Sequence, residues 1–296
     1  MTKFSNIRNY ANLSVAPMMD WTDRHCRYFH RTLSKNTLLY TEMVTSPALI
    51  KGNATHLLEF DKSEHPVALQ LGGSDPIELA KAAVIGSKYG YDEINLNVGC
   101  PSDRVQSGTF GAVLMKTPEV VAKCCKEMIG AVDKEVTVKC RIGVDQQTPD
   151  VTLPKFLEHI SNAGVTRVII HARKAILSGL SPKQNRNVPP LNYELVYKMK
   201  ELFPDLHLSL NGGVQSIQQA KSHLENGIDG VMIGRAAYQK PGEVLKLAVK
   251  RMLPGGVLGR KQRRSTTRHR ERKVCMQGRE LLPRDNYKCQ HCRGLL

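Results

Sequence analysis

The sequence contains no run of about 20 consecutive apolar residues, and so we expect no membrane-spanning helix. Residues 1–17 (MTKFSNIRNYANLSVAP) also have no apolar core of the kind that a secretory signal peptide requires. We therefore expect a cytoplasmic protein with no membrane partner.

Cysteine is too sparse for a fold held together by disulfides, with eight in 296 residues. In a reducing cytoplasm we expect all of them to be free thiols. One CxxC pair, Cys289 and Cys292, has His269 and Cys275 upstream of it. Because the second pair that zinc fingers usually contribute is absent, we predict no metal site.

Acidic residues are scarce only at one end of the chain. The formal net charge is +16, but residues 246–296 hold 15 Lys and Arg against three Asp and Glu, whereas residues 1–245 hold 28 against 24. A basic segment of this kind suggests a polyanionic partner, or it is simply a solvated, disordered extension. Both interpretations remain open.

Short apolar or alternating runs alternate with amphipathic stretches over most of the chain. The expected strands are 12–17, 38–44, 66–72, 93–99, 136–143, 167–173, 206–213 and 230–235. The expected helices are 76–90, 117–132, 152–164, 192–204, 216–227 and 241–253. Asp75-Pro76 and Thr117-Pro118 are typical of helix starts, with a capping residue followed by proline.

Eight such units in series predict a parallel (β/α)8 TIM barrel, which needs about 250 residues. A doubly wound open sheet is the alternative, but it would have GxGxxG after its first strand, where this chain has VAPMMDWTDR. We predict a catalytic barrel over residues 1–253. Residues 254–296 have little periodicity and are predicted to form a basic, disordered tail.

In such a barrel, reactive groups lie at the C-terminal ends of the strands. Those ends carry Pro17, Met18, Met19, Gln70, Asn97, Cys100, Lys139, Arg141, His171, Arg173, Asn211, Gly212, Gly213, Gly234 and Arg235. Taken singly, several have ordinary structural explanations: Gln70 could cap a helix, His171 could be a hydrogen-bonded core residue, and NGG (211–213) could be a plain turn. All of them fall on one rim, which favours a site.

The last two strand ends favour a phosphate. NGG offers backbone N–H groups with no side chain in the way, and Arg235 adds a guanidinium, at the position where many barrels bind phosphate. Lys139 and Gln70 lie on the opposite arc, so the ligand would be elongated. FMN fits, because its isoalloxazine ring needs one cation and amide groups at its edge.

Seven stretches resemble the tRNA-dihydrouridine synthases, most of all the bacterial A-type subfamily. They are APMMDWTD, ALQLGG, INLNVGCPSDRVQSGTFGAVLM, VKCRIGVD, IIHARKAILSGLSPKQNR, LSLNGGV and VMIGRAAY. The resemblance covers about residues 10 to 245. It implies an FMN-containing barrel that uses NADPH to reduce the C5=C6 bond of particular D-loop uridines in tRNA; for the A-type, these are position 20 and its neighbour.

The resemblance also implies roles for individual residues. Cys100 would be the general acid. The FMN-binding residues would be Pro17, Met18, Met19, Gln70, Lys139, His171, Asn211, Gly212, Gly213, Gly234 and Arg235. The tRNA-binding residues would be Asn97, Gln184, Arg186 and Asn187. Arg141, Arg173, Lys174 and Arg186 could hold the RNA backbone.

Cys100 stands between Gly99 and Pro101, where a strand ends. A buried filler, a metal ligand, half of a disulfide and a reactive thiol are all conceivable there. The compartment argues against a disulfide, and no Cys or His shares the loop to complete a metal site. An ordinary thiol has a pKa of about 8.5 and still carries its proton at neutral pH, so it can protonate C5 after hydride has reached C6.

The resemblance ends where the family has a helical domain that grips tRNA, because the basic tail stands in its place. The tail could bind RNA through phosphates, could be inert, or could be an altered family end. Two other functions therefore remain open: an FMN barrel acting on a free pyrimidine, and a tRNA-binding protein with weak or lost turnover. We expect a monomer.

Overall fold

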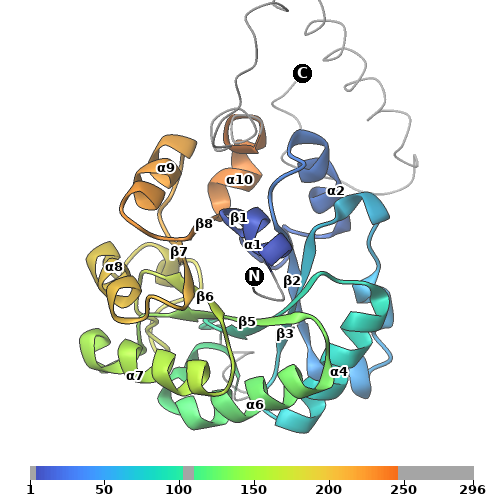
Figure 1. The fold of residues 1–296 in the computed structure, drawn as a ribbon, viewed down its shortest axis with the longest axis horizontal. Helices are drawn as coiled ribbons and strands as arrows, with labels where there is room; N and C mark the ends of the chain where they lie inside the picture. Colours follow the sequence, from blue (N-terminus) through green and yellow to red (C-terminus); the bar gives the residue numbers. More distant parts are fainter. Residues whose placement is uncertain (1–4, 103–109, 246–296) are drawn as a thin grey trace, which may run out of the picture. The chain divides into compact units, whose positions relative to one another are not determined.

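The computed structural model describes residues 5–102 and 110–245 (Figure 1). Within them, eight parallel strands form one sheet in the order β1-β8-β7-β6-β5-β4-β3-β2. The strands are β1 Leu13–Val15, β2 Leu39–Thr45, β3 Val67–Gly72, β4 Glu93–Val98, β5 Glu135–Arg141, β6 Arg167–His171, β7 His207–Asn211 and β8 Gly230–Ile233. A bridge between Ser14 and Leu38 joins β1 to β2 and closes the ring. The predicted (β/α)8 barrel is confirmed.

Helices surround the strands, as Figure 1 shows in a view down the barrel. The α-helices are α1 Ser5–Ala11, α2 Arg24–Leu33, α3 Ser46–Ile50, α4 Pro76–Tyr89, α6 Pro118–Ala131, α7 Pro149–Asn162, α8 Tyr193–Leu202, α9 Ile217–Glu225 and α10 Arg235–Gln239. The short 3-10 helices are η1 Thr55–Leu58, η2 Lys62–Glu64, η3 Gly111–Lys116 and η4 Gln184–Arg186. No described helix is long and apolar enough to cross a membrane.

Every predicted strand is confirmed to within a few residues, and so are the helices predicted between them. Asp75 caps α4 as predicted, since its side chain accepts a hydrogen bond from the backbone of Glu78. Thr117 precedes α6 but makes no side-chain capping bond, in contrast to what the Thr-Pro pattern suggests. Residues 241–245 are helical. The rest of the helix predicted over 241–253, and the boundary and tail predicted at 254–296, lie outside the described residues.

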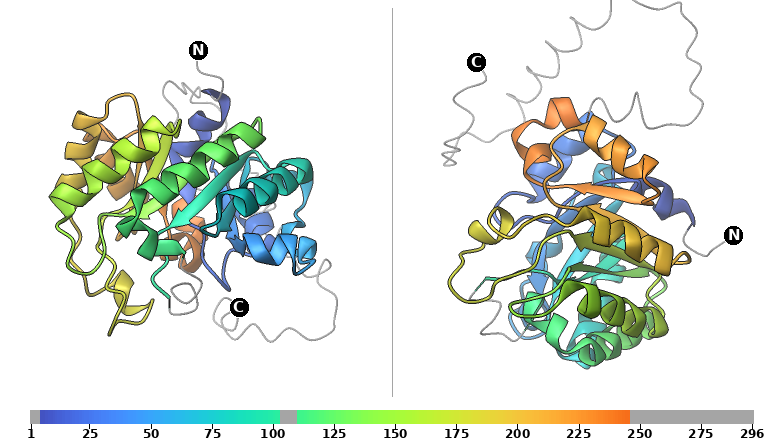
Figure 2. Two further views of the ribbon diagram at one scale, coloured as in Figure 1. Left: turned by 90° about the horizontal axis from the view of Figure 1, so that it is seen from below. Right: turned by 90° about the vertical axis from the view of Figure 1, so that its left-hand side faces the viewer.

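Helix α1 covers the N-terminal end of the barrel. The Arg8 guanidinium donates to Oε1 of Glu135, the first residue of β5, at 3.0 Å, and the backbone N–H of Leu38 donates to the Tyr10 carbonyl. The segment that contains η4 lies at the opposite end of the barrel from α1 (Figure 2, right). That opposite end is therefore the open mouth.

The apolar core has two layers. The larger lies between strands and helices, and a small inner cluster of seven buried residues fills part of the barrel itself. In β4 the outward positions are Ile94, Leu96 and Val98, whereas the alternate positions are polar. The barrel interior is therefore partly polar. There, Glu93, Asn95, Thr137, Arg167 and Ser209 are buried.

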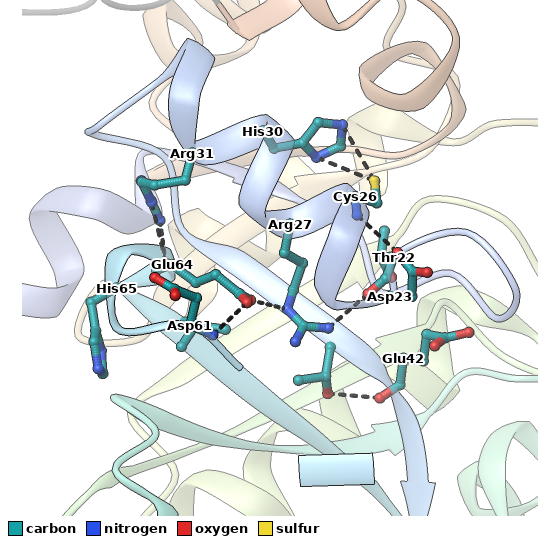
Figure 3. A network of polar contacts seen from close by, with 12 residues as sticks. Thr22, Asp23, Cys26, Arg27, His30, Arg31, Glu42, Asp61, Glu64 and His65 are labelled. Carbon is teal, nitrogen blue, oxygen red and sulfur yellow. Dashed lines mark hydrogen bonds and ion pairs between the residues drawn. The ribbon is translucent and has the colours of Figure 1, made fainter. Parts of the chain in front are cut away.

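Helix α2 attaches to the barrel mainly through polar contacts (Figure 3). Nε of Arg27 donates to Oε2 of Glu64 in η2 at 2.6 Å, and its Nη1 donates to the Thr22 carbonyl at 2.9 Å. Asp23 caps the helix through a bond from the Cys26 backbone N–H. The Arg27–Glu64 ion pair is almost completely buried and so fixes α2 in position.

Candidate active site at the barrel mouth

The strand ends predicted to form a site do converge on the mouth. Neighbouring strands pair Asn97 with Lys139, Arg141 with His171, and His171 with Asn211. The ammonium group of Lys139 donates to Oδ1 of Asn211 at 3.1 Å, although the two residues lie on strands that are not adjacent. The side chains of β5 and β7 therefore meet at the same opening.

Lys139 is a cation in a desolvated position. Burial lowers its pKa to about 8, and the positive charge of Arg141 adds to this effect. Among the described residues it forms no ion pair, and its ammonium group donates to the neutral amide of Asn211. A partly buried cation without a carboxylate suits an electron-rich or anionic ligand group at the mouth.

His171 is buried between cationic neighbours. Burial lowers its pKa well below the usual value, and Arg141 and Lys139 lower it further. The imidazole is therefore neutral at physiological pH. A neutral ring can donate one hydrogen bond to a ligand without adding charge to an already positive rim.

The turn after β7 and the side chains beside it form a cradle that suits a phosphate. Gly212 and Gly213 have positive φ angles of 113° and 72°, and a Cβ on Gly212 would lie 2.6 Å from a carbon of the His171 ring. Nε of Arg173 is buried, and no hydrogen-bond partner reaches it among the described residues. An orphaned cationic donor next to a side-chain-free turn fits the phosphate of FMN.

Arg235 begins α10 at the same place. Its Nη2 donates to Oδ1 of Asn187 at 2.8 Å, and the Asn187 carbonyl accepts from Arg173 at 3.3 Å. Asn187 was predicted to bind tRNA, but here it connects the two arginines of the cradle. The tRNA-binding role of Asn187 stays a prediction.

The turn that carries Cys100 is held by one side chain. Oδ1 of Asn97 accepts the backbone N–H of Gly99 at 3.0 Å and that of Cys100 at 2.9 Å. The thiol is free and partly exposed, and it lies 3.5 Å from the Ser102 hydroxyl. Cys100 is therefore neither a core filler nor part of a disulfide.

Arg141 is buried and supports the loops. Its guanidinium donates to three carbonyl oxygens: Gly99 at 3.0 Å, Lys174 at 3.0 Å and Asn185 at 2.9 Å. The expectation that Arg141 could hold the RNA backbone is wrong, because its side chain is 3% exposed and is used within the protein. It ties the Cys100 turn to the loop after β6.

The loop after β6 depends on Asn185, which the sequence analysis passed over. Its Nδ2 donates to the carbonyls of Ile176 at 2.8 Å and Leu180 at 3.0 Å, while its Oδ1 accepts from the Ile176 backbone at 2.7 Å. The predicted tRNA-binding residues on either side, Gln184 and Arg186, are exposed. The buried asparagine thus holds exposed polar neighbours at the mouth.

Further predicted ligands follow β1 and β8, which are adjacent strands. The Met18 backbone N–H is bonded to the Thr22 hydroxyl, Pro17 is partly buried, and Met19 is 52% exposed. A Cβ on Gly234 would lie 3.8 Å from the Met18 sulfur. The contribution of these residues to cofactor binding stays a prediction.

Glu42 in β2 is a further charged group that we did not predict at the rim. Its Oε1 accepts the Asp20 backbone N–H at 2.5 Å, and burial is the main cause of its raised pKa. A carboxylate within the otherwise apolar strand LLYTEMV was the signal for it.

Comparisons with known proteins agree with this arrangement. The family model described as "Dihydrouridine synthase (Dus)" matches residues 14–271. A protein from Escherichia coli (strain K12) named tRNA-dihydrouridine(20/20a) synthase is 56% identical over 243 residues, which are 82% of this chain and 70% of the relative. Proteins of the same name from Shigella flexneri and Shewanella oneidensis are 56% and 54% identical, and the chain covers 71% of each. The chain belongs to the dihydrouridine synthase family, a family of oxidoreductase enzymes, as the motifs at its strand ends predicted.

Proposed function

We propose that this protein reduces the C5=C6 bond of uridine in tRNA to 5,6-dihydrouridine, with positions 20 and 20a of the D-loop as its targets. The relatives' names support the substrate and the positions. The observation that carries the chemistry is the partly exposed Cys100 turn after β4, next to Lys139 of β5, a cation that forms no ion pair with any residue in 5–102 or 110–245.

The residues at the mouth fit FMN. Gly212, Gly213, Arg173 and Arg235 would hold its phosphate, while Lys139 would face its ring. Gln70, also predicted to bind FMN, is 1% exposed, and its side-chain amide is bonded to Asn95 and Asn97. When bound and reduced by NADPH, FMN supplies a hydride to C6 of uracil. Neutral His171 adds a hydrogen-bond donor beside the cradle.

Cys100 supplies the proton. Addition of hydride at C6 leaves excess electron density at C5, which must take up a proton from a nearby acid. The Cys100 S–H bond breaks, the proton goes to C5, and the thiolate regains a proton from solvent. Asn97 and Arg141 hold the turn that presents this thiol.

The substrate base must leave its stack to reach the mouth, which costs least in a loop of the RNA. Gln184 and Arg186 are exposed beside the mouth and are proposed to contact the RNA. A charged contact to phosphate and an amide contact to a base edge together give affinity and orientation.

Mass spectrometry of tRNA from cells with and without the gene tests this function. Loss of dihydrouridine at positions 20 and 20a on deletion is the expected result. Unchanged tRNA, together with turnover of free uracil or orotate by the purified protein, would instead assign a free pyrimidine as substrate.

Cys100→Ala tests the proton donor. We expect the variant to keep its flavin and to lose about 10²- to 10⁴-fold in the rate of tRNA reduction. The matched control is Cys26→Ala, since Cys26 is also a free, partly exposed thiol but lies on α2. Normal turnover by Cys100→Ala would remove Cys100 from the mechanism while leaving the overall reaction in place.

A further inference from the structure

A continuous chain of hydrogen bonds crosses the barrel interior from the Cys100 turn to its N-terminal end. Five side chains on three neighbouring strands form it, and each is at most 8% exposed. In order from the turn, they are Asn97, Gln70, Asn95, Thr137 and Glu93.

All the bonds of this chain have the same direction. The Cys100 N–H donates to Asn97 Oδ1, Asn97 Nδ2 donates to Gln70 Oε1 at 2.8 Å, and Gln70 Nε2 donates to Asn95 Oδ1 at 2.8 Å. Asn95 Nδ2 then donates to the Thr137 hydroxyl at 2.8 Å, and that hydroxyl donates to Oε1 of Glu93. No primary amide in the chain can be flipped alone, because each flip would place two donors or two acceptors face to face.

The groups at the two ends of the hydrogen-bond chain both require this direction of donation, from the Cys100 turn towards Glu93. At the mouth, the backbone N–H groups of Gly99 and Cys100 need an acceptor, so Asn97 must present its oxygen to them. At the far end, Glu93 is surrounded by donors: the Arg167 guanidinium contacts Oε2, and the Tyr40 hydroxyl donates to Oε1 at 2.8 Å. Burial raises the pKa of the Glu93 carboxyl, but the Arg167 guanidinium opposes this effect and forms an ion pair with it. The carboxylate of this ion pair can only accept, so Thr137 must donate to it.

Glu93 belongs to a charge-balanced cluster. Arg167 also donates to Glu135 at 3.1 Å, and Arg8 donates to Glu135 at 3.0 Å. The cluster thus contains two carboxylates and two guanidiniums. Glu135 shares the cluster and lies beside Glu93 in the sheet, but in the part of the protein that the structure describes it forms no hydrogen bond with any of the five side chains, which makes it a matched control for Glu93.

We propose that Glu93 is a positioning residue: its carboxylate sets the orientation of the three buried amides and so keeps the Asn97 oxygen under the Cys100 turn. This rests on the proposed function, since the role of the turn is to present the Cys100 thiol to uracil. Glu93 touches no substrate, and its effect travels through Thr137, Asn95 and Gln70. Without the carboxylate, only the two backbone N–H groups at the mouth still fix the direction of the hydrogen bonds, and the buried amides adopt the reversed orientation more often.

The test separates the two half-reactions of the holoenzyme in Glu93→Gln. Flavin reduction by NADPH needs no acid from Cys100, whereas oxidation by tRNA does. We expect the tRNA half-reaction of Glu93→Gln to slow at least ten-fold relative to the NADPH half-reaction, with little change in KM for tRNA. Glu135→Gln loses the same charge from the same cluster, and we expect it to leave the ratio of the two rates at the wild-type value.

Thr137 provides a second variant in case Glu93→Gln does not fold. Thr137→Val keeps the shape of the side chain but breaks the chain, so it should slow the tRNA half-reaction as Glu93→Gln does. Thr137→Ser keeps the hydroxyl and should restore the wild-type ratio. Backbone hydrogen exchange adds a readout that needs no turnover: the amides of Gly99 and Cys100 should lose protection in Thr137→Val and keep it in Thr137→Ser and Glu135→Gln.

The proposal is overturned if Glu93→Gln and Thr137→Val fold and keep the wild-type ratio of rates and the protection at Gly99 and Cys100. It is also overturned if Glu135→Gln shows the same loss, because the effect would then belong to the cluster as a whole. Wild-type protein that forms no dihydrouridine in tRNA would contradict the proposed function, whereas the exchange measurement would still decide the role of Glu93.

Discussion

At the scale of single residues, Lys139 places a positive charge at the mouth of the barrel, where burial makes that charge unfavourable for folding. Lys139 has a pKa of about 8 because burial and Arg141 both disfavour its charged form. A basic group whose pKa is lower in the folded state than in the unfolded chain destabilises the fold at every pH below that folded value. At neutral pH, Lys139 therefore lowers the stability of the folded state, although the proposed cofactor needs its charge.

Lys139→Met should accordingly stabilise the flavin-free protein at pH 7. Taking the pKa from about 10.5 unfolded to about 8 folded, we expect a gain on the order of 2 kcal/mol. The gain should shrink as the pH rises from 8 towards 10.5, where lysine loses its proton in both states. Urea unfolding of both proteins across this pH range measures the difference, and a variant that is less stable at pH 7 would contradict it.

The convergence of the strand ends was predictable from the sequence, because one rule is enough for it. The ends of parallel strands meet at one edge, so Lys139, His171 and Asn211 could be placed together from strand positions alone. Arg141 and Asn97 were placed correctly too, but their partners were not foreseeable, because these are backbone groups whose position depends on loop conformation. Hydrogen-bond partners across strands depend on register, which the sequence pattern does not specify.

At the scale of elements, strands were easier to predict than the helices near the N-terminus. The buried residues of α2 include Arg27, His30 and Arg31, and so the helix has no apolar stripe for a periodicity argument to find. Helices with apolar buried faces, such as α7 with Leu153 and Phe156, were found. Helix α2 was therefore not predicted, because its packing is polar.

The anchoring of α2 can be tested by breaking its buried ion pair. Arg27→Met leaves the Glu64 carboxylate buried without its partner, and we expect a loss of about 3–5 kcal/mol in the free energy of unfolding. Adding Glu64→Gln removes the stranded charge and should recover at least half of that loss. Thermal or urea unfolding of the single and double variants measures this, and strictly additive effects would show that the pair is not coupled.

At the scale of the whole molecule, the charge is distributed unevenly. The predicted tail, 254–296, holds 12 Lys and Arg against three Asp and Glu. The family match continues to residue 271 and so includes part of that range. The boundary at 253 stays a prediction, as do the monomeric state and the cytoplasmic location.

The contribution of residues 254–296 to tRNA binding is measurable through salt. Each phosphate that a basic side chain neutralises steepens the dependence of log K on log salt by about 0.7 to 0.9. We expect a chain ending at residue 253 to bind tRNA more weakly at low salt and with a flatter slope. Equal slopes for the two chains, with flavin content as a control for folding of the barrel, would show that the segment is inert.

The polar attachment of α2 has a consequence for the order of folding. Arg31 donates to the carbonyls of Glu64 and Pro66, which lie 33 and 35 residues further along the chain. A helix without an apolar face gains little from general collapse, and it can dock only after these distant carbonyls are in place. We therefore expect α2 to join late, with φ-values near zero in the folding transition state, and to be the first helix to detach when the barrel unfolds.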